Sequence, residues 1–343
     1  MGNEASLQYW FGTHDCASQA IAAMGKIKSP ELEPVLLTFV RNASQVDLLS
    51  RLPDLVFQFG QRFKLAEIAA NLIKTGRPCY TGYPPEMLPT DFHELSEELG
   101  KIKQIQSDVL SGKVDSPFPK DEKIVLGSST HDLGATLADE RIRVAYDAIM
   151  SLQIVLAWTA FEVLAGDLWR EAVNAHPTGL SDLRGSVGNS AKTTKAAGDQ
   201  RDGKSISLVQ LQKYKFNVSK SMGTLLIDER KVSFTSLEDI QIAYKRAFFE
   251  HADSILGNLN DWSLNALSVL RNLIVHRSLV CDDSYIDRTS EGKLPQLPKL
   301  NKGETLSLDG LLVQNTLRSS FVCMVGFIRC VDSWINVHPD PSR

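Results

Sequence analysis

The chain has 343 residues, 43% of them hydrophobic and 23% charged, and its formal net charge is −4 at pH 7. These values are ordinary for a soluble globular protein and allow a sizeable core, in two modest domains or in one helical domain with large insertions. No strong basic block indicates nucleic-acid binding, so any contact with RNA must come from local patches of charge.

Cysteine usage and hydropathy indicate a reducing compartment and no membrane. The five cysteines are scattered, odd in number and without the spacing of a metal site, so we expect free and mostly buried thiols. The N-terminus lacks the charged and apolar regions of a signal peptide. The most apolar stretch, residues 148–166, contains Glu162 and lies between Asp147 and Asp167. We therefore predict a buried core helix and a cytoplasmic protein.

The N-terminal region, residues 1–134, is predicted to be mostly helical, and nothing in it indicates a function. Residues 34–40 suit either a short strand or the start of a helix. Apolar residues then follow helical spacing over 46–75, where Pro53 should interrupt the helix, and again over 91–110.

A stretch rich in Gly and Pro ends at residue 134 and marks the predicted domain boundary. From there, residues 135–343 are predicted to form an all-α domain with a flexible, Gly-rich insert at 177–205. A loop that contains Pro and Gly is predicted at 282–303. Apolar residues at helical spacing predict the helices 138–175, 208–227, 237–251, 254–279 with a break near Asp261, and 306–335.

One helical segment, poor in charge, ends in Arg271-Asn272-Leu-Ile-Val-His276-Arg277. At about 100° per residue, its apolar side chains cover most of the helix circumference. Arg271 stands beside the narrow polar stripe that remains, and buried polar groups need partners. The segment therefore holds either a packed ion-pair network or a functional site. The stripe consists of Asp261, Asn265, Ser268, Asn272 and His276.

Glu162 follows a run of uncharged residues, 148–161, inside the most apolar predicted helix. A carboxylate in such surroundings should be either paired with a cation or protonated. Arg271 is the best candidate for that cation. We therefore expect the two helices to pack together with Glu162 near Arg271, because an uncompensated buried charge would cost several kcal/mol.

The pattern Arg271-Asn272-x-x-x-His276 resembles the commonest motif of the HEPN superfamily, a group of all-helical domains. The likeness extends to Asp282 and Tyr285, since an aspartate and an aromatic residue often follow the motif. Trp158-x-x-Phe161-Glu162 is similar to the first long helix of several HEPN groups, which carries an acidic residue facing the motif. The resemblance covers roughly residues 140–337 and implies a HEPN-like helical bundle there.

The resemblance implies a metal-independent endoribonuclease, in which the RNA 2′-hydroxyl attacks the adjacent phosphorus and leaves a 2′,3′-cyclic phosphate. An imidazole takes or gives a proton near neutral pH, which suits His276. Arg271 would pair with the phosphate, and Asn272 would orient the imidazole or the phosphate. Glu162 and Arg277 would support these groups. The sequence contains no paired-His or Gly-rich phosphate motif, and we expect no metal and no cofactor.

RNA is the expected partner, together with a second copy of the chain in a homodimer whose interface includes the polar stripe. Basic residues of the insert are expected to contact RNA phosphates, namely Lys192, Lys195, Arg201 and Lys204. The protein could act as a toxin with an antitoxin partner, as a phage-defence effector or in RNA processing. The alternative is a non-catalytic HEPN module for RNA or nucleotide binding or for dimerisation. A buried His276 would favour that alternative.

Overall fold

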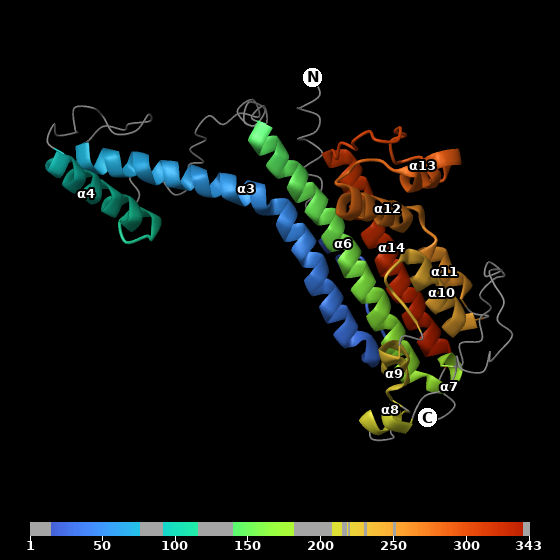
Figure 1. The fold of residues 1–343 in the computed structure, drawn as a ribbon. Helices are drawn as coiled ribbons and strands as arrows, with labels where there is room; N and C mark the ends of the chain where they lie inside the picture. The colour runs from blue at the N-terminus through green and yellow to red at the C-terminus, as the bar shows by residue number, and fades with distance from the viewer. Residues whose placement is uncertain are drawn as a thin grey trace. The chain divides into compact units, whose positions relative to one another are not determined.

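The structure, a computed structural model, describes residues 15–75, 92–115, 140–181, 208–214, 218, 220–229, 232–249 and 252–338. The protein is all-α, as predicted, and the β-type pairing among these residues is an isolated bridge between Val280 and Thr305 (Figure 1). The helices are α2 (Cys16–Ala22), η1 (Pro30–Leu32), α3 (Glu33–Thr75), α4 (Phe92–Leu110), α6 (Glu140–Ala175), α7 (Pro177–Leu180), α8 (Leu208–Lys213), α9 (Met222–Asp228), α10 (Leu237–Phe248), α11 (Asp253–Leu259), α12 (Trp262–Arg277), α13 (Asp283–Thr289), η5 (Ser290–Gly292) and α14 (Gly310–Val337).

The chain divides into two compact units, and the division differs from the predicted boundary at residue 134. Residues 1–50 join 140–343 in unit 1, and 51–139 form unit 2. Two interactions join the first helices to the C-terminal part of unit 1. The backbone N–H of Ser29 donates to Asp332 Oδ1 of α14 at 2.8 Å, and Phe39 packs against Phe321 of α14 at 6.4 Å between ring centroids.

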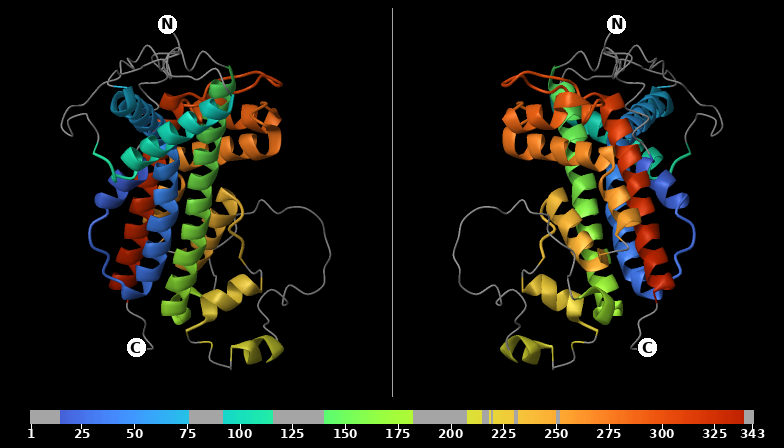
Figure 2. Two further views of the ribbon diagram at one scale, coloured as in Figure 1. Left: turned by 90° about the vertical axis from the view of Figure 1, so that its left-hand side faces the viewer. Right: turned by 90° about the vertical axis from the view of Figure 1, so that its right-hand side faces the viewer.

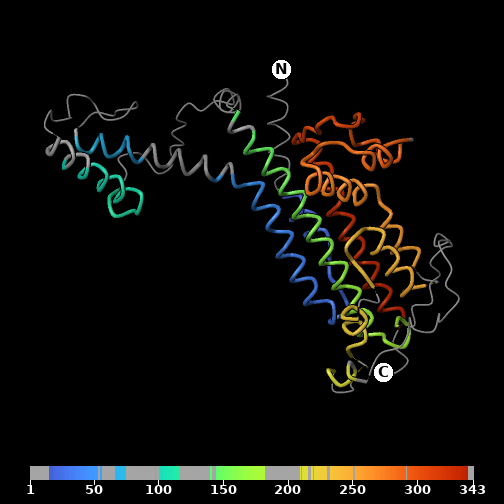
Figure 3. Tube along the Cα trace, viewed as in Figure 1, coloured from blue at the N-terminus to red at the C-terminus, as the bar shows by residue number. Residues whose placement is uncertain are grey.

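The core of unit 1 lies among α6, α12 and α14, which pack against one another (Figure 2). In the chain trace, the first half of α3 runs beside α6, and both helices contribute to the same core (Figure 3). Buried aromatic residues of different helices pack against one another. The ring centroids of Tyr244 in α10 and Phe327 in α14 are 4.9 Å apart. The Tyr244 hydroxyl donates to the Ala165 carbonyl oxygen at 2.8 Å, so this buried polar group is satisfied.

Several predicted helices begin where a side chain caps them. The break expected near Asp261 separates α11 from α12, and Asp261 Oδ1 accepts a hydrogen bond from Ser263 N at 2.8 Å. Asp309 caps α14 in the same way through Leu312 N at 2.7 Å. The predicted stop after Ala175 is also found, since α6 ends there and Pro177 begins α7.

Three local predictions were wrong. Helix α3 is continuous from Glu33 to Thr75, because a proline such as Pro53 removes only one backbone hydrogen bond from a long helix. Residues 208–227 form two short helices, since α9 starts where Asn174 Oδ1 accepts from Gly223 N. The predicted loop at 282–303 contains α13, whose start Asp282 caps through Tyr285 N at 3.0 Å.

Four cysteines lie among the described residues, and all four are free thiols. Three of them are buried, as predicted, and Cys330 is half-buried. Burial raises the pKa of Cys16 and of Cys323 to about 12. Both thiols therefore remain protonated near neutral pH and act as small apolar groups in the core.

Among the described residues, the segments Val144–Ala175 and Gly310–Val337 are long and apolar enough to cross a membrane by length and composition. Core helices meet the same criterion, and one or two such helices are weak evidence of a span. In this structure α6 and α14 pack against each other and against α12. About half of the most apolar window of each is buried inside the protein, 50% and 56%.

Candidate catalytic site on helix α12

Helix α12 is buried along its first half and emerges at its C-terminal end. Leu264, Leu267 and Leu270 are fully buried, whereas Asn272, Val275, His276 and Arg277 are exposed. The helix ends at Ser278, whose φ of 50° places it in the left-handed region and turns the chain away. The end of α12 therefore projects its last polar side chains into solvent.

The predicted polar stripe is not one continuous accessible face. Ser268 is 3% exposed and faces the core, and Asp261 caps the helix. The accessible arc of α12 is rotated toward Trp262, which is half-buried and lines a pocket together with Asn265. Neighbouring helices cause this rotation, because α6 and α14 cover the other arcs.

Arg271 brings the three motif residues together. Its Nη1 donates to Asn272 Oδ1 at 3.0 Å and lies 3.3 Å from His276 Nε2. A guanidinium group has only donors, so His276 Nε2 is the acceptor in this contact. The contact places the imidazole beside the group that would meet a phosphate.

Glu162 lies on α6, which packs against α12 as expected. Burial raises the pKa of the Glu162 carboxyl, and the nearby positive charge of Arg271 lowers it. Glu162 and Arg271 therefore interact electrostatically. Arg271 itself is half-buried, and it contacts the exposed residues Asn272 and His276.

Replacing Glu162 by glutamine is expected to stabilise the protein increasingly as the pH rises. Burial raises the pKa of the Glu162 carboxyl in the folded protein above its ordinary value of 4.5. The stability that the protonated carboxyl contributes is therefore fully present below pH 4.5, and it is lost as the pH rises through the folded-state pKa. Glutamine does not ionise, so its advantage grows across that window. Solvent screening limits the effect to about 1 kcal/mol. Denaturant unfolding at a series of pH values measures it, and an advantage that shrinks with rising pH would contradict the argument.

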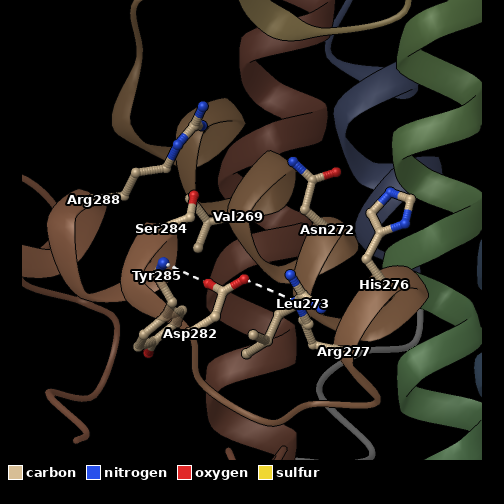
Figure 4. Close-up of a pocket in the computed structure, with 9 residues that line it drawn as sticks. All are labelled: Val269, Asn272, Leu273, His276, Arg277, Asp282, Ser284, Tyr285 and Arg288. Carbon is tan, nitrogen blue, oxygen red and sulfur yellow. Dashed lines mark hydrogen bonds and ion pairs between the residues drawn. The ribbon is translucent and has the colours of Figure 1, made fainter. Parts of the chain in front are cut away.

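A cavity of about 310 Å³ opens beside His276, between α12 and α13. Asn272 and His276 extend into it from α12, while Ser284 and Arg288 extend from α13 (Figure 4). Tyr285 also lines it, and burial raises the pKa of Tyr285 to about 12, so this phenol stays protonated. The cavity thus collects an imidazole, an amide, a hydroxyl and arginines, groups that suit a phosphate ligand.

Arg277 holds the two walls of this cavity together. Its Nε donates to Asp282 Oδ2 at 3.0 Å, while Asp282 Oδ1 accepts from Tyr285 N (Figure 4). Hydrogen bonds from the Tyr285 backbone and from Arg277 lower the pKa of Asp282 below its ordinary value. Arg277 therefore positions α13 beside α12.

Sequence reasoning missed two cavity residues, Ser284 and Arg288. The segment that contains them was read as a loop, although Asp282 at its start is a good N-cap residue and was the available signal. Arg288 Nη2 donates to Glu238 Oε1 of α10 at 2.6 Å. The basic residues of the insert, Lys192, Lys195, Arg201 and Lys204, lie outside the described residues.

A scan against models of protein families gives no match for this chain, and searches of curated proteins and of solved structures give none either. The likeness to HEPN domains therefore depends on the motif residues and their setting. Those residues are Glu162, Arg271, Asn272 and His276.

Proposed function

We propose that the protein is a metal-independent endoribonuclease of HEPN type. The observation that supports this most is the exposure of His276 in contact with Arg271, at the mouth of a cavity lined by Arg277 and Arg288. A purely internal network would bury the imidazole. An exposed imidazole beside several cationic groups suits proton transfer next to a bound phosphate.

The reaction needs two proton transfers and stabilisation of charge. The 2′-oxygen forms a bond to phosphorus and loses its proton to a base, while the bond to the 5′-oxygen breaks and that oxygen gains a proton. The exposed imidazole of His276 would accept or return a proton. Arg271 would turn toward the phosphate and stabilise the charge that develops on its oxygens.

A homodimer would supply a second imidazole, so that one His276 acts as base and the other as acid. The available surface is the face of α6 that leads to Glu162, where Val144 is 58% and Leu152 is 46% exposed. Light scattering should show a dimer at micromolar concentration, and Leu152→Glu should give monomers without cleavage. Leu37→Glu, on the exposed face of α3, is the control and should remain dimeric. A monomeric wild-type protein would rule out a composite site.

The test of the function is a cleavage assay with purified protein, single-stranded RNA and EDTA. We expect products that end in a 2′,3′-cyclic phosphate, identified by mass spectrometry, because the 2′-hydroxyl is the nucleophile. RNA binding without cleavage of any RNA tested would support a non-catalytic HEPN module instead. Cleavage that EDTA abolishes would contradict the metal-independent mechanism.

A further inference from the structure

A second cavity of about 510 Å³ adjoins the first along α12. The two share Val269 and Arg288 in their linings, so they are neighbours, and we call them together the groove. Trp262, Asn265, Val269, Asn272 and His276 lie on one arc of α12 and form its floor. From Trp262 to His276 this floor is about 21 Å long, given about 1.5 Å per residue. That length accommodates a few nucleotides of an extended strand.

The two parts of the groove differ in chemistry. The part beside His276 is lined by two arginines, Arg277, which pairs with Asp282 at 3.0 Å, and Arg288, which pairs with Glu238 at 2.6 Å. In the second part Arg288 and Lys293 are balanced by the acidic residues Glu238 and Asp287. The remaining N–H donors of the two arginines suit a phosphate, and the balanced end suits a neutral group.

Aromatic and amide groups gather in the balanced part. Trp262 is half-buried and lines it, which offers an aromatic surface on a rigid helix. Asn260 Oδ1 accepts from Gln241 Nε2 at 3.0 Å, and Asn265 Nδ2 donates to the Asp261 carbonyl oxygen at 3.0 Å. These contacts use the oxygen of one amide and the nitrogen of the other. The cavity is thus lined by a ring surface and by two amide side chains, the kinds of group that recognise a nucleobase.

We propose that the cavity at Trp262 binds the base of a nucleotide a few positions from the scissile phosphate, with Trp262 stacking on the base and Arg288 contacting a phosphate between the two sites. This proposal rests on the proposed ribonuclease function for its substrate class. The subsite orders the strand along α12 and so places the 2′-hydroxyl near His276. The contribution that the test measures is the one to RNA affinity.

The test measures binding of a short single-stranded RNA with 2′-fluoro riboses, which lack the nucleophile. Trp262→Leu should weaken this binding about fivefold or more, the range for loss of one base–aromatic stack. Trp262→Phe should restore most of the affinity, and an abasic strand should bind the wild type and Trp262→Leu equally. Val322→Ser is the matched control, because Trp262 also lines a neighbouring groove with Val322 and that groove should not matter.

The outcomes separate this subsite from the ribonuclease function. If the wild type binds the RNA but does not cleave its natural-ribose form, the proposed function fails and the Trp262 result still decides the subsite. If the wild type cleaves RNA and Trp262→Leu binds as tightly as the wild type, the subsite is overturned and the function stands. A wild type that does not bind single-stranded RNA overturns the subsite, as does an equal loss of affinity in Val322→Ser.

Discussion

Replacing His276 by alanine is expected to lower the rate of RNA cleavage by at least about a hundredfold, the smaller end of what a general acid or base contributes. His276 is exposed at the end of α12, so its removal opens no cavity in the core. Thermal unfolding should therefore change little, as for other surface substitutions. His338→Ala, at the far end of α14 from this site, is the matched control and should cleave RNA like the wild type.

Arg271→Ala should abolish cleavage to a similar extent, and Arg271→Lys should not rescue it. A lysine ammonium is a point charge and cannot contact Asn272, His276 and a phosphate through a planar fork. Arg271→Lys preserves a positive charge opposite Glu162, so loss of activity with retained stability would show that geometry matters and not charge alone. Wild-type protein without activity, together with variants destabilised by a few kcal/mol, would show that the motif is a structural network.

Replacing Gly223 by alanine is expected to destabilise the protein by about 1–3 kcal/mol, the usual cost of overpacking. A Cβ at this position would lie 2.3 Å from the Arg170 carbonyl oxygen and 3.0 Å from Arg170 Cα. These are backbone atoms of α6, so they cannot move aside as the end of a side chain could. Gly223 N also donates to Asn174 Oδ1 at 2.9 Å, which fixes α9 at this close approach.

Gly257→Ala is the matched control for Gly223→Ala. Gly257 is also helical, in α11, but a Cβ there would meet no atom within 4 Å. Alanine should stabilise the protein at this position by about 0.4–1 kcal/mol, because it restricts the unfolded chain and favours the helix. Urea unfolding of both variants measures the two effects. Equal stability of the two variants would show that α9 does not pack tightly on α6.

The sequence by itself determined the all-α class and most helix limits, because periodicity and capping are local properties. Asp261 and Asp309 bond to backbone N–H groups two or three residues away, and these starts were predicted within a few residues. Local spacing also placed Asn272 and His276 on one face, since they are four residues apart, and the long side chain of Arg271 contacts both from beside that face. The need of Glu162 for a cation followed in the same way from its apolar surroundings.

Only the tertiary structure decided which residues share the core and which arc of α12 meets solvent. Asp47 and Ala17, or Phe39 and Phe321, are far apart in sequence, so no local pattern assigns the first helices to unit 1. The exposed side of α12 could not be predicted from the sequence either. This helix is apolar over most of its circumference, and the side that meets solvent depends on which sides α6 and α14 cover. The same holds for the wall that α13 adds to the cavity beside His276. Helix α13 is too short to give a periodic signal in the sequence, and the Arg277–Asp282 ion pair places it.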